Sequence, residues 1–135
     1  MVKTVNNQSE ETDCIQLSLP LNAAYVSAAR LTASSVANRM GFSTDEIEDI
    51  KAAVSEACTF VIKKAPAEPA GNFLIQFHMS SAMMSIHIET HGLLRQEPDE
   101  MSLIMIKALT DKLEIKTDNE KTYIFMTKSH NDSLF

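Results

Sequence analysis

Glycine is scarce in this chain, with three among 135 residues. Loops that cradle phosphates depend on glycine, because a Cβ atom obstructs close approach of the backbone. The sequence therefore leaves no room for a glycine-rich phosphate loop. Its two cysteines, Cys14 and Cys58, are too few and too scattered for a disulfide framework. Their scarcity predicts a reduced, cytoplasmic protein.

Long apolar runs and excess positive charge are also missing. No run approaches the roughly 18–20 apolar residues that span a bilayer, and residues 1–11 lack the apolar core of a signal peptide. We therefore expect no membrane association. Twelve basic against eighteen acidic side chains give a net charge of −6. That balance excludes a uniform polyanion-binding surface, so we expect no direct contact with nucleic acid.

Hydrophobic patterning predicts one domain over residues 13–128, between polar tails at 1–12 and 129–135. Apolar residues alternate as in strands at 14–19, 73–79, 84–88, 113–117 and 121–127, and recur at helical spacing between Asn22 and Gly41, after Ser43, and after Glu97. The order is strand, helix, helix, strand, strand, helix, strand, strand. It predicts an α+β fold, a two-layer α/β sandwich with about three helices on one mixed, mostly antiparallel sheet.

Two of the helices carry specific expectations. Ser43 and Glu46 are spaced as a capping box, which predicts that the second helix begins there. The last helix is expected to bury an apolar face made of Met101, Ile104, Met105, Ala108 and Leu109. Methionine is concentrated in this chain, and either fills core gaps or forms an adaptable binding surface: Met79, Met83, Met84, Met101, Met105 and Met126.

The run Val54-Ser55-Glu56-Ala57-Cys58-Thr59, with residues 45–51 before it, resembles the bacterial anti-sigma factor serine kinases. Residues 30–32 and 38–42 resemble the first helix of that family and the turn after it. The family belongs to the histidine kinase-like ATPase (GHKL) superfamily, which has the Bergerat fold. The resemblance covers roughly residues 14–128 and implies an ATP site that uses Mg²⁺.

Within that resemblance, the residues expected at the ATP site are largely replaced. Glu56 matches the family's general base, but Phe60 stands where an asparagine ligates magnesium, and a benzyl group has no lone pair for that ion. Thr90 replaces the aspartate that reads adenine, and only Gly92 remains of the first glycine box. In place of the Gly-x-Gly of the second glycine box stand Glu100, Met101 and Ser102, where a carboxylate would repel phosphates.

The ATP lid is missing as well, because eight residues, 93–100, connect Gly92 to Met101 where the family has a few tens. The sequence therefore predicts a pseudokinase with a vestigial Glu56 and no ATP or Mg²⁺ cofactor. Helical geometry places Phe60 near the flank of the apolar stripe. There it would pack under a neighbouring loop, plug the vacated pocket or anchor a partner.

Without an ATP site, the expected function of this protein is to bind a partner protein. Arg30 matches the arginine with which the family contacts a sigma factor and an anti-anti-sigma (STAS-type) protein; otherwise it is an ordinary surface arginine. The resemblance also implies a homodimer, with its contact expected at residues 14–19. We expect a non-catalytic, degenerate anti-sigma factor that regulates bacterial transcription. The alternatives are an active ATP-binding serine/threonine kinase that uses Glu56, and a structural subunit.

A metal site is a separate possibility. His87, Glu89 and His91 alternate along one predicted strand face, but residues two apart lie about 6.5–7 Å apart, so a further ligand is needed. His78 is a poor candidate, because a tight turn at Ser80-Ser81 would pair it with residue 83, away from His87. A solvated strand face is the simpler interpretation.

Overall fold

The computed structural model describes residues 13–65, 71–94, 97 and 100–130, so the predicted tail at 1–12 lies outside the described residues. Its elements, in chain order, are β1 (Asp13–Pro20), the short 3₁₀ helix η2 (Ala23–Tyr25), α1 (Val26–Met40), α2 (Thr44–Lys64), β2 (Asn72–Met79), β3 (Met83–His91), α3 (Met101–Leu109), β4 (Lys112–Asp118) and β5 (Lys121–Ser129). The predicted order of elements is confirmed. β5 extends two residues beyond the expected 121–127, so Ser129 lies in the predicted C-terminal tail.

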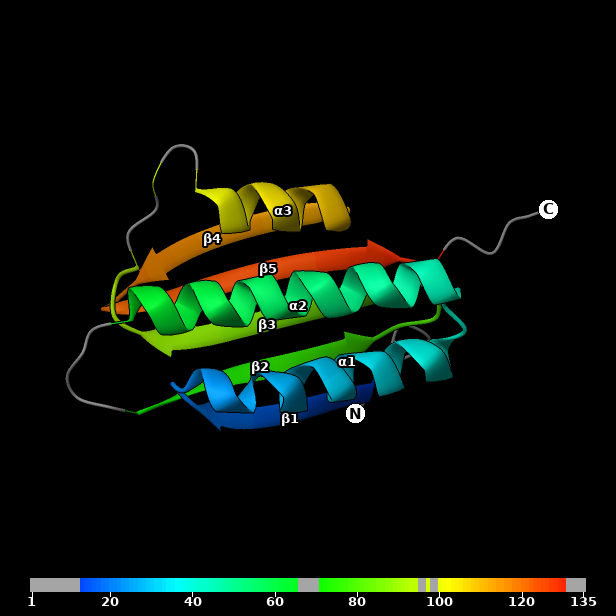
Figure 1. Ribbon diagram of the computed structural model, residues 1–135, viewed down its shortest axis with the longest axis horizontal. Helices are drawn as coiled ribbons and strands as arrows, with labels where there is room; N and C mark the ends of the chain where they lie inside the picture. The colour runs from blue at the N-terminus through cyan, green and yellow to red at the C-terminus, as the bar shows by residue number, and fades with distance from the viewer. Residues whose placement is uncertain (1–12, 66–70, 95–96, 98–99, 131–135) are drawn as a thin grey trace, which may run out of the picture.

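The five strands form one sheet in the order β1-β2-β3-β5-β4 (Figure 1). Every neighbouring pair of these strands is antiparallel, so the prediction of a mixed sheet was wrong. A single crossover helix would return the chain for a parallel strand. Between β1 and β2 there are two helices, α1 and α2, which return the chain to the end of the sheet at which β1 finishes, so Asn72 at the start of β2 pairs with Pro20. Between β3 and β5, α3 and β4 likewise return the chain to the end of the sheet at which β3 finishes, so Lys121 at the start of β5 pairs with His91.

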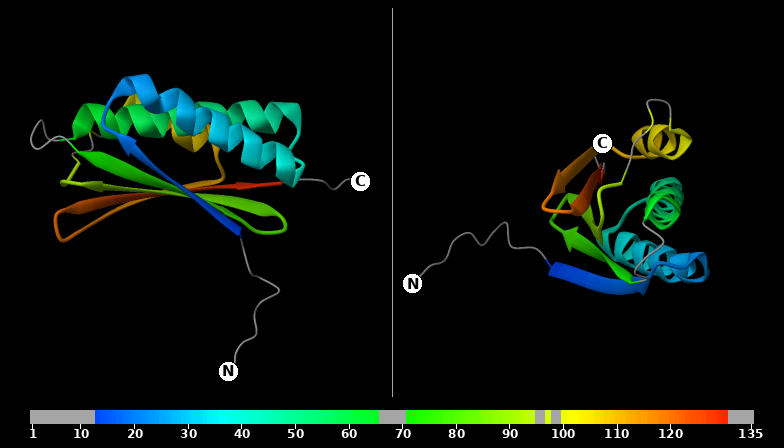
Figure 2. Two further views of the ribbon diagram at one scale, coloured as in Figure 1. Left: turned by 90° about the horizontal axis from the view of Figure 1, so that it is seen from below. Right: turned by 90° about the vertical axis from the view of Figure 1, so that its left-hand side faces the viewer.

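All three helices cover one face of the sheet, and the other face is left open (Figure 2). α1 lies over the β1–β2 side, α2 over the middle, and α3 over the β5–β4 side (Figure 1). The core lies between the layers, where alternate strand residues such as Phe77, Ile86 and Ile124 are fully buried. The fold is therefore the predicted two-layer α+β sandwich, and each strand has one core face and one open face.

Local chemistry sets the ends of the helices. Ser43 Oγ accepts from the Glu46 amide at 3.1 Å, and Glu46 Oε1 accepts from the Ser43 amide at 2.7 Å, so the predicted capping box is present. Gly41 ends α1 in the left-handed conformation (φ 90°), which favours glycine. α2 ends at Lys64, two residues before Pro66. Asn22 caps η2, so α1 begins later than predicted.

α3 is turned differently from the prediction. Leu103 and Ile106 are its buried side chains, whereas Met101, Ile104 and Met105 are 65%, 49% and 38% exposed. The helix is apolar almost all round, with only Ser102 and Lys107 polar, so its pattern did not define one inner face. Packing against the side of α2 decided the orientation and left an apolar stripe outside.

Candidate functional site

Phe60 is part of the core. It lies on α2, 1% exposed, among the largest fully buried side chains of the domain. The expectation that it sits on the flank of the buried stripe was wrong, because α3 packs beside α2 and widens the face that α2 buries. A side chain this deeply buried cannot anchor a partner at the surface. Of the three predicted roles, its burial fits both packing and plugging of the vacated pocket.

An ion pair between Lys64 and Glu100 lies beside the ring of Phe60. Lys64, one helical turn later, places its Nζ 5.9 Å from the centre of the Phe60 ring and 3.0 Å from Glu100 Oε1. Both charged side chains are mostly buried, with 24% and 20% of their surface exposed. Glu100 is the N-cap residue of α3, but its carboxylate makes no cap hydrogen bond. The ion pair instead links the end of α2 to the start of α3.

Thr90 and Gly92, which the resemblance matches to the first glycine box, lie in a turn that is held by hydrogen bonds. Gly92 has φ 97°, a conformation that favours glycine, and its amide donates to the carbonyl of Glu120 at 2.6 Å. Thr122 Oγ1 donates to the Gly92 carbonyl at 2.7 Å and accepts from the Leu94 amide at 3.0 Å. Thr90 is 2% exposed, with its hydroxyl 3.4 Å from the carbonyl of His91. This glycine therefore has a structural reason to be present.

Sequence reasoning missed Lys64, Leu94 and Thr122 in this region. The sequence did hold a signal for Lys64, because its spacing of four from Phe60 places both residues on one side of α2. Leu94 is 4% exposed and belongs to the same core as Phe60. No pattern in the sequence indicated that the connection after β3 turns inward there.

Glu56 and Ser102, the other residues expected at the site, are half-buried on α2 and in the first turn of α3. Glu56 makes no hydrogen bond or ion pair with any residue that the structure describes. Surface depressions among the described residues lie on the open sheet face, beside β1, and at the end of β2 and β3, where Thr90 forms part of the lining. None of the three is lined by Glu56, Phe60, Glu100 or Ser102.

These residues do not fit Mg²⁺ and ATP. The side chain where the metal ligand is expected is a buried phenyl ring, and the start of α3 carries a carboxylate that already pairs with Lys64. Mg²⁺ takes oxygen ligands, and a phosphate at a helix N-terminus needs free backbone amides with no competing negative charge. The arrangement can stabilise the junction of α2 and α3, but it offers neither group to a nucleotide.

Arg30 and its surroundings are accessible, as predicted. Arg30 is exposed on α1 and has no ion pair with a described residue. The next residue, Leu31, is 70% exposed, and Tyr25, just before α1, is 47% exposed. A charged side chain beside exposed apolar ones is common in protein-binding surfaces. We name Tyr25, Arg30 and Leu31 the α1 surface.

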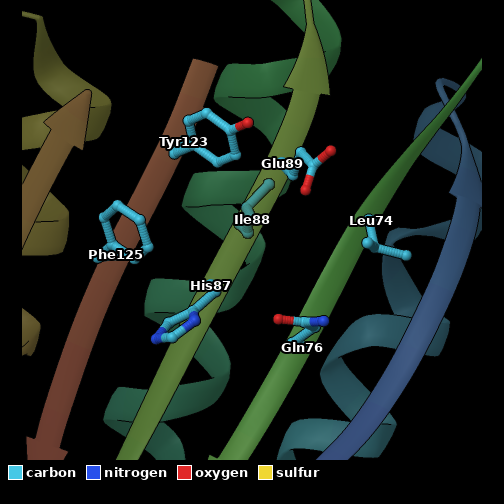
Figure 3. A pocket seen from close by; sticks show the side chains of 7 residues that line it. All are labelled: Leu74, Gln76, His87, Ile88, Glu89, Tyr123 and Phe125. Atoms are coloured by element: carbon cyan, nitrogen blue, oxygen red, sulfur yellow. The ribbon is translucent and has the colours of Figure 1, made fainter. Parts of the chain in front are cut away.

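His78 and His87 lie on the open sheet face, where Figure 3 shows His87 and Glu89 projecting from β3 beside Phe125 and Tyr123 of β5. The predicted separation of His78 from His87 was wrong. The turn takes Ser80–Ala82, so His78 pairs with Ser85, and its ring centre lies 4.5 Å from that of His87. Burial, and then the nearby His78, lowers the pKa of His87.

These side chains stack with one another and do not converge on an ion. Glu89 accepts from Lys121 Nζ at 2.8 Å, and this hydrogen bond, with the charge of Glu89, raises the pKa of Lys121. Over the described ranges, no group of three or more His, Cys, Asp and Glu side chains is placed to hold a metal ion. The same residues include no helix long and apolar enough to cross a membrane.

Comparison with known proteins agrees with this architecture. The profile of the histidine kinase-like ATPase domain family matches residues 19–128. The serine-protein kinases RsbW of Bacillus cereus (strain AH820) and of Bacillus anthracis are 34% identical to this chain, over 88% of it and 86% of each relative. In Mycobacterium tuberculosis, the solved RsbU and RsbW domains of Rv1364c match with a TM-score of 0.74 at 16% identity, over 92% of this chain and 34% of that one.

Proposed function

Because this chain belongs to the histidine kinase-like ATPase family, among the anti-sigma factor serine kinases of the RsbW type, we propose that it is a non-catalytic, cytoplasmic member that regulates bacterial transcription by binding. The observation that carries the proposal is the buried Phe60, covered by the Lys64–Glu100 ion pair where Mg²⁺ and phosphates would bind. The partner is a sigma factor or an anti-anti-sigma (STAS-type) protein, and no cofactor is needed.

Calorimetry with ATP and Mg²⁺ tests the loss of the nucleotide site. We expect no saturable heat at ligand concentrations up to the millimolar range, and no rise in the melting temperature, because Phe60 and Glu100 offer neither a metal ligand nor a phosphate cradle. The full chain is used, with an active RsbW kinase as the positive control. Saturable binding would contradict the proposal.

The second candidate is an active serine kinase, and the name of the relatives at 34% identity favours it. In that case Glu56, half-exposed on α2, would act as the general base. Transfer of labelled phosphate from ATP to a STAS-type protein, abolished in Glu56→Gln, would establish this function in place of ours. Phosphate transfer that survives in Glu56→Gln would indicate a contaminating kinase.

The α1 surface is the proposed contact with the partner. Replacing Arg30 by glutamate is expected to weaken binding to a sigma factor or STAS-type protein at least tenfold, or about 1.4 kcal/mol, because it reverses a charge beside the exposed Leu31. Arg39→Glu is a matched control, since Arg39 is also exposed on α1 but nine residues on, about half a turn round the helix. Binding measured by calorimetry that falls equally in both variants would contradict this assignment.

We also propose a homodimer in which β1 meets its symmetry mate. β1 pairs with β2 on one side only, so its other edge is free among the described strands, and Ile15 is 40% exposed there. Free strand edges are sites at which another chain can pair. β1 and α3 lie at opposite edges of the molecule (Figure 1), so this contact leaves α3 accessible.

A further inference from the structure

The open face of the sheet carries an aromatic surface on β5. Tyr123 and Phe125 are two residues apart, so both project from this face, and their ring planes are 8° from parallel with centres 6.3 Å apart. Figure 3 shows the two rings side by side along the strand, with their faces turned the same way. We name Tyr123 and Phe125 the β5 platform. The core does not use this platform, because the core lies on the helix-covered face of the sheet.

The β5 platform borders a depression of about 220 Å³ that extends across β3 to β2. The other residues that line it come from β2 and β3: Leu74, Gln76, His87, Ile88 and Glu89. A cavity of about 150 Å³ is enough to hold benzene, so this depression has room for one small ring system. It is smaller than the pockets of roughly 300–1,000 Å³ that hold drug-sized ligands.

The walls of the depression are held in place by contacts within the protein. The His87 ring stands at 80° to the Phe125 ring with centres 4.9 Å apart, an edge-to-face contact that aromatic rings favour. Gln76 Nε2 donates to Gln16 Oε1 at 2.8 Å, and Gln76 Oε1 lies 3.2 Å from His78 Nε2. A ligand that binds here therefore has few side chains to order, which lowers the entropic cost of binding.

The charged groups around the depression are already paired. Glu89 accepts from Lys121 Nζ at 2.8 Å, and Lys116 Nζ lies 3.7 Å from Glu114. The pKa of His87 is lowered, so its imidazole is uncharged at neutral pH. A charged ligand would therefore find no free countercharge among these groups, whereas an uncharged ring needs none.

We propose that the β5 platform binds a small, uncharged aromatic compound, whose ring stacks on Tyr123 and Phe125. Aromatic rings prefer such offset stacking. The Tyr123 hydroxyl, which forms no hydrogen bond with a described residue, is available to a polar atom at the edge of the ligand. Lys116 Nζ lies 5.9 Å from the centre of the Phe125 ring, but this side chain is 61% exposed and can move aside. The site does not depend on the proposed function, because the α1 surface belongs to the helical layer.

Titration of the isotope-labelled full chain with indole, followed by NMR, tests this proposal. Indole is planar and uncharged. We expect saturable shifts that are largest at the ring protons of Tyr123 and Phe125 and at the amide of His87, with a dissociation constant in the millimolar range because the depression is open to solvent. Cyclohexanol, which is uncharged but not aromatic, and the anion indole-2-carboxylate should each bind at least about fivefold more weakly. Equal binding of either compound would overturn the proposal.

Variants locate the site. Phe125→Leu keeps an apolar side chain but removes one ring of the platform, and should weaken indole binding at least about fivefold. Ile104→Ala, which removes a 49% exposed apolar side chain on α3, is the matched control and should bind indole as the unmodified protein does. Circular dichroism checks folding, and Tyr123→Leu replaces Phe125→Leu if the latter does not fold. Unchanged binding in the folded platform variant, or shifts concentrated elsewhere, would show that the platform is not the site.

Discussion

Phe60→Ala is expected to lower the free energy of unfolding by about 3–5 kcal/mol, which is typical of deleting a fully buried phenyl ring. Phe60 is 1% exposed and sits where α2, α3 and the sheet share one core. The loss combines the transfer free energy of the ring with the cost of the cavity left beneath the Lys64–Glu100 ion pair. Urea unfolding followed by circular dichroism measures it.

Phe60→Asn introduces the side chain with which, by the resemblance, the family ligates magnesium. This variant distinguishes a structural role of Phe60 in the core from a role in which it only replaces the metal ligand. We expect it to be at least as destabilising as Phe60→Ala, because it also buries an amide. It should not create Mg·ATP binding, since Thr90 and Glu100 are unchanged. Ile62→Ala, on the same helix but only half-buried, is the comparison and should lose less stability. A loss below about 1 kcal/mol for Phe60→Ala would mean that the ring is not part of the core.

Some elements followed directly from local sequence. The capping box at Ser43, the glycine that ends α1 and the alternation along β2 and β3 each depend on residues close together in the chain. Local chemistry of this kind is specific, because a cap or a pleat uses fixed spacings. The fold class followed from the order of these elements.

The predictions that were wrong concerned packing between elements. The burial of Phe60 and the orientation of α3 were decided by the contact between α2 and α3, which no single helix encodes. The stacking of His78 on His87 depended on where one turn placed the register of β2 and β3. A shift of one residue on one strand changes its neighbours across the sheet.

At the candidate site, too, features that depend on residue type were predicted and features that depend on packing between elements were not. Replacement of the ATP-binding residues stays a prediction, made from residue types at the positions that the family resemblance matches. The Lys64–Glu100 ion pair that occupies the junction could not be predicted, because its two residues lie on different helices. Their approach depends on how the chain between them turns.

Raising the pH from 8 to 10.5 is expected to cost this protein about 2 kcal/mol of stability through Cys58 alone. Burial raises the pKa of the Cys58 thiol from 9.0 to about 12 in the folded protein. Above pH 9 the unfolded chain therefore releases this proton while the folded chain keeps it. The unfolded state then binds fewer protons, so the free energy of unfolding falls with pH, by up to about 1.4 kcal/mol per unit.

Urea unfolding in reducing buffer at several pH values measures this effect, with Cys58→Ala compared to the unmodified protein. Lysines and tyrosines also titrate in this range, but their contributions are shared and cancel in the difference. Cys58→Ala should be less stable at pH 8, because it leaves a cavity, yet lose less stability as the pH rises. Cys14→Ser, which changes the exposed cysteine, should retain the full pH dependence. An identical fall in Cys58→Ala would show that the thiol ionises as readily in the folded protein as in the unfolded chain.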